Sequence, residues 1–599
     1  MKSHSLRLST LSAAVLLVLA SGCGVQAPAP DGSPGATLPA VTATTPAQPE
    51  VDTAGNAPRD ALASEAKRKL PKAREEIAAS RDDRGQVAAS VHRSAETRML
   101  VGAVAPAPAP QLVDLAGIRA PSAEVNRDRF APIHDNPVHA VAEDPVSTFS
   151  IDVDTGAYAV VRRHLNEGRL PPEDAVRVEE LINYFDYAYA APADTGTPFA
   201  VTTEVAPAPW NDAAMLVRVG VKGFEVAAAD RPAANLVFLV DVSGSMQSAD
   251  KLPLLKSALG LMLQGLTARD RVSLVVYAGA SGVVLEPTPG DQAARIRAAL
   301  DQLSAGGSTH GSAGIELAYA MAEQGRVAGG INRVILATDG DFNVGTVNHE
   351  QLVDLVERKR HTGISLTTLG FGGGNYNDAL MEQLADHGNG HYAYIDTVNE
   401  ANKVLVEELS STLQTIASDV KIQVEWNPVE VAEYRLIGYE NRVLAREDFT
   451  NDKVDAGEIG AGHRVTALYE IVPTGSAGRR LPELRYGSGA PDPNAAHRGE
   501  LGWLKLRFKK PGEGGSTLVE QPIAKPAANA TLAGATDDLR FAASVAAFGQ
   551  KLRGGRYTGT YGYSDIAALA AGSRGADRFG YRGEFLRLVH LAESLDSRS

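Results

Sequence analysis

The stretch from Asn235 to Met246 constrains the fold more than any other part of the chain. Five apolar residues, Leu236 to Val240, run without interruption and include β-branched types, which predicts a strand buried on both faces of a parallel sheet. The run ends at Asp241, and oxygen-bearing side chains recur at Ser243 and Ser245. Open α/β sheets place their ligand sites at the carboxyl ends of such strands. The stretch therefore predicts a metal-binding edge of a sheet.

Strand-like and helix-like patterns alternate from about residue 233 to residue 416. Stretches typical of buried strands at 271–277, 334–338 and 364–369 are separated by apolar residues at helical spacing. This alternation predicts an α/β domain with a doubly wound, mostly parallel sheet and helices on both faces.

Two later segments supply further oxygen-bearing side chains. The Gly-rich loop Gly306-Gly307-Ser308-Thr309 precedes a predicted helix, and Asp339 follows a buried strand. Together with the Asp-x-Ser-x-Ser sequence at 241–245, these elements stand in the order found in von Willebrand factor A (VWA) domains. The segment resembles such a domain and its metal-ion-dependent adhesion site.

The resemblance implies that the hydroxyls of Ser243, Ser245 and Thr309 bind a divalent cation directly, while Asp241 and Asp339 act chiefly through water. Oxygen ligands suit Mg²⁺, and Mn²⁺ or Ca²⁺ could substitute. Neutral ligands leave the ion electrophilic, and in VWA proteins a partner protein typically supplies a Glu or Asp to it. The resemblance thus implies metal-dependent protein binding. The alternative is a structural VWA scaffold whose metal stabilises the fold.

The segments on either side of the VWA-like region alternate with period two, which predicts antiparallel strands with one wet face. These strand-like stretches lie at 199–205, 215–221, 420–426, 465–472 and 504–508. The entry and exit points of an inserted domain can lie side by side. We therefore predict one β-sandwich, formed by 196–232 and 417–525, that is interrupted by the VWA domain at 233–416.

The N-terminus resembles a targeting segment. The basic residues Lys2 and Arg7 precede an apolar run from Leu8 to Leu19. The sequence Ala20-Ser21-Gly22-Cys23 that follows resembles a bacterial lipoprotein cleavage site. This predicts a signal peptide over 1–22 and a lipid on Cys23, the single cysteine, that anchors the chain to the membrane of the bacterial cell envelope. The alternative is an ordinary signal peptide. Residue 24 is Gly rather than Asp. By the same resemblance, this implies that the lipoprotein is sorted to the outer membrane.

Composition divides the remaining residues. Residues 23–140 begin with a tract of Pro, Ala and Thr and continue as Ala-rich, charged sequence, which predicts a disordered tether. Helical spacing predicts an N-terminal helical segment at 141–195 and a C-terminal one at 526–599, where Thr536 is a candidate cap. With the VWA motifs, these segments resemble bacterial VWA-domain lipoproteins whose C-terminal domain has no assigned function.

Three other polar segments receive structural interpretations. Asp152 and Asp154 are interpreted as a strand-to-helix turn in which Asp154 or Thr155 caps the next helix, because the further ligands of an EF-hand are missing. His387 and His391 flank a Gly-containing turn, which favours a surface loop over a zinc site. The Tyr- and Gly-rich segment 556–565 is interpreted as ordered turns that pack Tyr rings on the sheet, with a binding loop as the alternative.

The net charge of −14 argues against nucleic acid as a partner, since binding to it requires clustered Lys and Arg. The segment 310–314 has His where a nucleophile elbow needs its first Gly, and 306–311 lacks the Lys of a P-loop. We therefore expect no enzyme. The less favoured alternative is a metal-assisted hydrolase that acts on envelope polymers.

Overall fold

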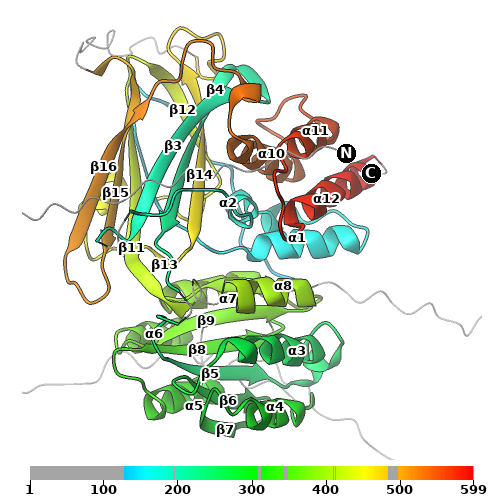
Figure 1. Ribbon diagram of the computed structural model, residues 1–599. Coiled ribbons are helices and arrows are strands. Elements are labelled where there is room, and N and C mark those ends of the chain that lie inside the picture. Colours follow the sequence, from blue (N-terminus) through cyan, green and yellow to red (C-terminus); the bar gives the residue numbers. More distant parts are fainter. Residues whose placement is uncertain are drawn as a thin grey trace, which may run out of the picture. The chain divides into compact units, whose positions relative to one another are not determined.

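Figure 1 shows the computed structural model, which describes residues 127–597 apart from 194–195, 228, 308–311, 341–348, 409–410, 412 and 483–496. The predicted signal peptide, Cys23, most of the predicted tether and Thr309 lie outside the described residues. Within the described ranges, every helix is too short or too polar to cross a bilayer.

A six-stranded sheet forms the centre of the VWA-like segment (Figure 1). Its strand order is β10-β9-β8-β5-β6-β7, and all neighbouring strands are parallel except β6 and β7. Every residue of β5 is buried, as its uninterrupted apolar run predicted. The strands are β5 (Ala234–Asp241), β6 (Arg271–Tyr277), β7 (Ser281–Pro289), β8 (Ile331–Thr338), β9 (Ser365–Phe371) and β10 (Tyr392–Ile395).

Helices cover both faces of this sheet, as the alternating pattern predicted. One face packs against α3 (Leu252–Met262), α4 (Ala293–Asp301) and α8 (Val398–Asn402). The other face packs against α5 (Ser312–Gln324), α6 (His349–Arg360) and α7 (Asp378–His387). The short helix η3 (Gly244–Gln247) follows β5 directly.

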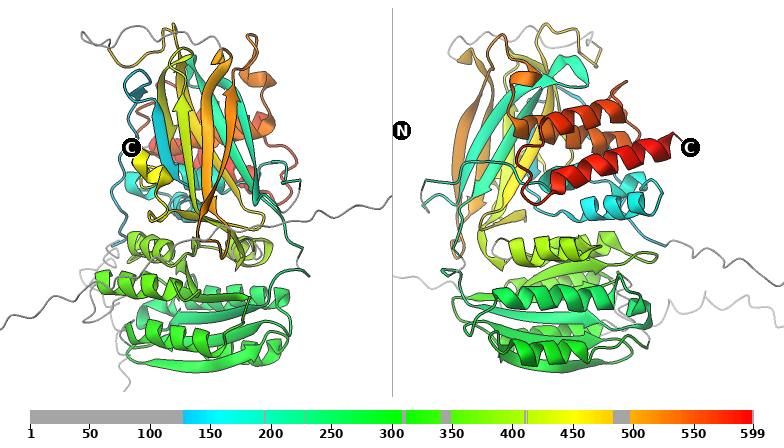
Figure 2. Two further views of the ribbon diagram at one scale, coloured as in Figure 1. Left: turned by 90° about the vertical axis from the view of Figure 1, so that its left-hand side faces the viewer. Right: turned by 45° about the vertical axis from the view of Figure 1, so that its right-hand side comes forward.

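Two antiparallel sheets enclose a second core and form a β-sandwich (Figure 2). One sheet has the order β1-β12-β14-β4-β3, and in the other β11 pairs with β13, β15 and β2, while β16 pairs with β15. The first sheet contains β1 (His139–Ala140), β3 (Phe199–Ala208), β4 (Asn211–Gly223), β12 (Val431–Ile437) and β14 (Arg464–Pro473). The second contains β2 (Val146–Ser150), β11 (Thr415–Trp426), β13 (Gly457–Gly460), β15 (Glu500–Lys509) and β16 (Ser516–Ala524).

The chain enters the VWA domain from β4 and leaves it into β11, and these two strands belong to the sandwich. A doubly wound VWA sheet inserted in a β-sandwich is therefore confirmed.

Residues 127–150 differ from the sequence expectation. The amide of Arg129 donates to the carbonyl oxygen of Tyr376 at 2.7 Å, and β1 pairs with β12, so residues 127–140 are not part of a disordered tether. The strand β2 pairs with β11 and belongs to the sandwich rather than to a helical segment. Both pairings join positions more than 200 residues apart, which a local pattern cannot reveal.

Helices from both ends of the described chain share one core. In it, α10 (Asp537–Leu552), α11 (Tyr563–Gly572) and α12 (Tyr581–Asp596) pack with α1 (Gly156–Asn166) and α2 (Val178–Asn183) (Figure 2). Thr536 caps α10, as predicted, by accepting the amide of Leu539 at 3.2 Å. On its other side α1 contacts β10, where a Cβ on Gly156 would come within 2.4 Å of the Tyr392 ring. Only glycine permits that approach without a shift of the ring.

Candidate metal centre

Asp241 lies at the carboxyl end of β5, where donors from three neighbouring elements fix its carboxylate. Oδ1 accepts the amide of Ser243 at 2.8 Å. Oδ2 accepts the hydroxyl of Thr338 at 2.9 Å and that of Tyr277 at 3.2 Å. Thr338 ends β8 and Tyr277 ends β6, the two strands that flank β5. The parallel register of the sheet therefore determines the orientation of Asp241.

Burial raises the pKa of Asp241 to about 6, and the charge of Asp339 contributes in the same direction, against hydrogen bonds from Ser243 and Thr338. Asp241 ends β5 and Asp339 directly follows β8, its parallel neighbour, so the two acidic residues lie at the same edge of the sheet. Such a pair is stabilised by a cation placed between or beside its members.

The two serines meet in the turn after β5. The hydroxyl oxygens of Ser243 and Ser245 lie 2.9 Å apart, with Ser243 buried and Ser245 exposed. The turn also contacts the Gly-rich loop: the amide of Gly244 donates to Gly307 at 3.1 Å, and the amide of Gly306 donates to Val242 at 2.8 Å. These bonds bring the residues just before Thr309 to the site, although Thr309 itself lies outside the described residues.

Asp339 follows β8 and is buried beside Lys251. The Lys251 ammonium lies 2.9 Å from Asp339 Oδ2 and 3.5 Å from Asn375 Oδ1, and Lys251 is only 7% exposed. Gly340 comes next with a φ of +88°, and a Cβ there would lie 2.4 Å from the Asn377 amide nitrogen. Glycine is required at this position, which explains the Asp339-Gly340 sequence.

Lys251 is a site residue that sequence reasoning missed. It immediately precedes α3 and is separated from Asp339 by 88 positions, so no local spacing links the two. The structure thus brings Asp241, Ser243 and Ser245 together with the loop before Thr309, and adds a lysine beside Asp339.

The residues fit a hard divalent cation, because hydroxyl and carboxylate oxygens are the donors such ions prefer. Ser243, Ser245, Asp241 and Asp339 would hold it from the described part of the chain. Lys251 places one positive charge beside Asp339, so it balances part of the acidic charge of the site before any ion binds.

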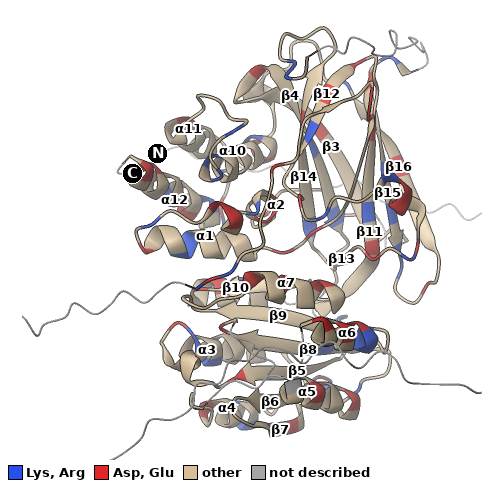
Figure 3. Cartoon of the chain, turned by 180° about the vertical axis from the view of Figure 1, so that it is seen from behind, with Lys and Arg blue, Asp and Glu red and all other residues tan. Residues whose placement is uncertain are grey.

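A second acidic cluster lies between α7, α2 and the sandwich. Carboxylate oxygens of Asp152, Glu180 and Glu382 lie within 4.8 Å of one another, and all three residues are buried. Figure 3 shows acidic residues along α7, on which Asp378, Glu382 and Asp386 recur at every fourth position. That spacing places them on one face and is the signal that could have revealed the cluster.

Two arginines neutralise part of this cluster. Arg177 pairs with Glu180, Asp378 and Glu382, and Arg442 pairs with Asp152, Glu382 and Asp386. Burial, with the charges of Asp152 and Glu382, raises the pKa of Glu180 to about 8, although Arg177 opposes the shift. The cluster thus acts as an ion-pair network that joins the VWA domain to the sandwich.

The predicted helix cap at Asp154 or Thr155 is wrong. The amide of Ala157 donates instead to Glu180 Oε2 at 2.7 Å, while Asp154 accepts the amide of Tyr392 at 2.8 Å. A carboxylate of α2, remote in sequence, therefore provides the cap.

The surface loop predicted for 387–391 is also wrong with respect to His391. This residue is 7% exposed, and its ring packs edge-on against His463 with centroids 5.1 Å apart.

Tyr557, in the Tyr- and Gly-rich segment, packs as expected near the sheet, with the Arg435 guanidinium of β12 3.9 Å from its ring centroid.

The comparisons with known proteins agree with this geometry. Residues 235–408 match the von Willebrand factor type A domain family, and residues 124–218 match a family described as von Willebrand factor. The chain is therefore a VWA-domain protein. VWA domains commonly bind a divalent metal, and the domain indicates a function in protein interaction.

Residues 411–595 match the family described as Uncharacterized protein YfbK, C-terminal. The chain is 48% identical to the Uncharacterized protein YfbK of Escherichia coli (strain K12) over 476 residues. These residues make up 78% of this chain and 81% of that relative. The chain therefore belongs to the YfbK family of VWA-domain proteins.

Other proteins match smaller parts of the chain or share a lower sequence identity with it. Human inter-alpha-trypsin inhibitor heavy chain H3 is 26% identical over 256 residues, which are 40% of this chain and 28% of that protein. A solved structure of von Willebrand factor type A from Catenulispora acidiphila is 16% identical in sequence to this chain, with a TM-score of 0.36. The match covers 66% of this chain and 91% of the chain in that structure.

Proposed function

We propose that this protein captures a partner protein through a divalent ion held at the carboxyl edge of the VWA sheet. The observation that carries the proposal is the convergence of the Ser243 and Ser245 hydroxyls, 2.9 Å apart, beside the rigidly held Asp241 carboxylate. Asp241 already has its hydrogen-bond donors in place, so its orientation toward an ion requires no rearrangement of the strands.

In this proposal Ser243, Ser245 and Thr309 hold Mg²⁺ directly, and Asp241 and Asp339 act through water; Mn²⁺ or Ca²⁺ can substitute. The bound ion supplies a position for an anionic oxygen, which an Asp or Glu of the partner protein provides. The protein recruits a partner and does not turn over a substrate, since the nucleophile and phosphate-binding motifs are incomplete in the sequence.

We also propose that a lipid on Cys23 anchors the chain to the cell envelope at the outer membrane. The lipoprotein-like sequence Ala20-Ser21-Gly22-Cys23 supports this proposal. Cells grown with an alkyne analogue of palmitate should label the wild-type protein but not Cys23→Ser, and the labelled protein should fractionate with outer membranes. Equal labelling of Cys23→Ser would contradict the anchor.

The metal site is tested first by isothermal titration of the full chain with Mn²⁺ and Mg²⁺. Asp241→Ala should bind either ion at least about tenfold more weakly than wild type, because it loses one of the two buried carboxylates. Asp301→Ala is the matched control, since Asp301 is an exposed carboxylate at the end of α4 in the same domain. Equal affinities of Asp241→Ala and wild type would refute the site.

Partner capture is tested by pull-down from envelope extracts in Mg²⁺ and in EDTA. Thr309→Ala should lose the same proteins that EDTA removes, while Ser257→Ala, a hydroxyl removed from the exposed face of α3, should retain them. Unfolding of Asp241→Ala or of wild type in EDTA, seen by circular dichroism, would favour the structural scaffold. Metal-dependent cleavage of peptidoglycan that Asp241→Ala lacks would favour the hydrolase.

A further inference from the structure

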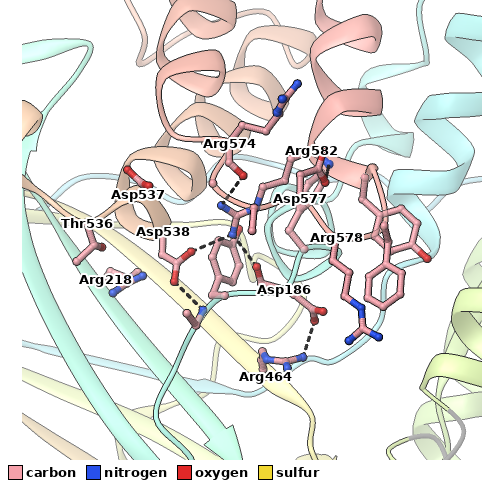
Figure 4. Close-up of a pocket in the computed structure, with 17 residues that line it drawn as sticks. Asp186, Arg218, Arg464, Thr536, Asp537, Asp538, Arg574, Asp577, Arg578 and Arg582 are labelled. Atoms are coloured by element: carbon pink, nitrogen blue, oxygen red, sulfur yellow. Dashed lines mark hydrogen bonds and ion pairs between the residues drawn. The ribbon is translucent and has the colours of Figure 1, made fainter. Parts of the chain in front are cut away.

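A cavity of about 650 Å³ lies between the C-terminal helices and the first sheet of the sandwich (Figure 4). Five arginines line it: Arg218 from β4, Arg464 from β14, Arg574 and Arg578 from the loop between α11 and α12, and Arg582 from α12. We call it the arginine pocket. It shares no strand or helix with the metal centre, so it is a separate candidate site.

The carboxylates that line the arginine pocket are already engaged. Asp538 accepts Arg582 at 2.9 Å and the amide of Ala188 at 2.6 Å. Asp577 accepts the amides of Arg582 at 3.0 Å and Gly583 at 2.8 Å, which caps α12. The other two, Asp186 and Asp537, accept Arg464 and Arg540. Each of the four carboxylates of the pocket therefore already has a donor of the protein itself.

The donors are not all occupied. Arg218 is 6% exposed, and while its Nη2 donates to Glu204 at 2.6 Å, its Nε and Nη1 have no acceptor among the described residues. The buried Nε of Arg464 likewise has none. Arg578 is exposed, and within the described chain no carboxylate pairs with it. The pocket thus retains unused cationic donors, which favours an anionic ligand.

Arg582 has a structural role and is not among these free donors. Its guanidinium donates to Asp538 and to the carbonyl oxygens of Asp186 and Ser573, and it lies 4.5 Å from the Phe541 ring centroid. Figure 4 shows the Arg582 guanidinium bonded to Asp538 and to the carbonyl oxygens of Asp186 and Arg574, whereas no bond is drawn to Arg578. Ligand contacts are therefore expected from Arg578, which is unpaired among the described residues, and from the Arg464 side chain, which is 29% exposed although it also pairs with Asp186.

An apolar surface lies beside the free arginine. Phe579 is 45% exposed, its ring stacks on Tyr581 with centroids 5.7 Å apart, and the Arg578 guanidinium lies 5.0 Å from its centroid. Exposed aromatic side chains of this kind are enriched at binding sites. The ligand should therefore carry an apolar or aromatic group next to its anionic group.

The charge balance selects among anions. Five arginines face four aspartates, which leaves an excess of one positive charge. A carboxylate carries one negative charge, whereas a phosphate monoester carries close to two and would be repelled by the aspartates. We propose that the arginine pocket binds an acidic peptide segment of a partner protein, with a Glu or Asp carboxylate at Arg578 and Arg464 and an apolar side chain on Phe579. This site acts without the metal ion.

The probe for this site is the capped dipeptide Ac-Phe-Glu-NH₂, added to the full chain in EDTA and followed by ligand-observed NMR. We expect binding at concentrations of about 10 mM or below, and at least about tenfold weaker binding of the neutral analogue Ac-Phe-Gln-NH₂. Because EDTA disables the metal centre, a positive result is independent of the proposed metal-dependent function, and a negative one leaves that function standing.

Arg578→Gln and Phe579→Ser should each weaken binding of Ac-Phe-Glu-NH₂ by about five- to tenfold. Both side chains are exposed, so both variants should keep the melting temperature of the wild type. The matched control is Arg587→Gln, which removes an arginine with a 64% exposed side chain from α12. Equal binding of the Glu and Gln peptides, or an unchanged affinity of Arg578→Gln, would overturn the proposal. Tighter binding of phenyl phosphate than of the peptide would overturn it in favour of a phosphate site.

Discussion

The ammonium of Lys251 lies 2.9 Å from the carboxylate of Asp339, and both side chains are almost completely buried. Removal of one partner of such a buried ion pair strongly destabilises a protein, because the remaining buried charge loses compensation. A divalent ion near Asp339 could supply the same compensation. Lys251 and the metal ion therefore act on the same carboxylate, and this competition can be measured.

Lys251→Met should melt at a lower temperature than wild type in EDTA, since removal of one partner of a buried ion pair costs about 3–5 kcal/mol. Mg²⁺ or Mn²⁺ should restore most of that loss, and titration should show metal affinity increased by roughly tenfold, because the competing cation is gone. Lys256→Met, which changes a lysine of α3 that contacts the carbonyl oxygens of Asp301 and Leu303, is the control. Weaker metal binding by Lys251→Met would mean that Lys251 positions Asp339 and does not compete.

Thr338→Val tests whether the sheet holds Asp241 in place. The Thr338 hydroxyl donates to Asp241 Oδ2 at 2.9 Å and accepts the amide of Gly340 at 3.2 Å, so the change removes two buried hydrogen bonds at once. We expect a loss of about 1–3 kcal/mol in the free energy of unfolding and a severalfold loss of Mn²⁺ affinity. Calorimetry and titration measure the two effects. A stability loss with unchanged Mn²⁺ affinity would show that Asp241 needs no support from Thr338.

The parts of the fold that the sequence predicted are those with local signals. The uninterrupted apolar run at 236–240 predicted β5, because a strand buried on both faces is apolar at every position. Apolar residues at helical spacing predicted α3, because a helix buried on one face repeats its apolar residues with the helical period. Asp241, Ser243 and Ser245 could be predicted as neighbours for the same reason: they lie within five positions at the end of one strand. Thr536 was found as a cap from its place before an apolar stripe.

The parts that the sequence did not predict depend on contacts between distant residues. Lys251 reaches Asp339 across 88 positions, and Glu180 caps α1 from another helix. The edge pairing of β2 with β11 could not be read from β2 itself, since an alternating strand pairs equally well with any compatible edge. Burial of His391 likewise depends on the sandwich residue His463.

Arg442→Met tests the ion-pair network between the VWA domain and the sandwich. Arg442 donates to Asp386 at 2.6 Å and contacts Asp152 and Glu382 at 3.3 Å, so its loss leaves buried carboxylates without compensation. We expect a destabilisation of about 3–5 kcal/mol and faster amide hydrogen exchange in α7. The control Arg446→Met removes an exposed arginine nearby. Unchanged exchange in α7 would show that Arg177 alone is sufficient to hold the network.

The paired imidazoles of His391 and His463 predict how stability depends on pH. Burial, followed by the charges of Lys403 and Arg464, lowers the pKa of His463 from 6.5 to about 3, and burial with the charge of His463 also lowers that of His391. Between pH 3 and pH 6.5 the unfolded chain therefore binds more protons than the folded one. The contribution of these histidines is fully present above pH 6.5 and is lost as the pH falls toward 3.

His463→Gln isolates this effect, because the glutamine amide oxygen can still accept the Gly460 amide that now donates to Nδ1 at 3.3 Å. Denaturant unfolding at several pH values between 4 and 7 should show the wild type losing up to about 1.4 kcal/mol more per pH unit than the variant as the pH falls. The two curves should run parallel above pH 6.5, where the histidine is neutral in both states. Parallel curves over the whole range would mean that His463 is not kept neutral in the folded protein.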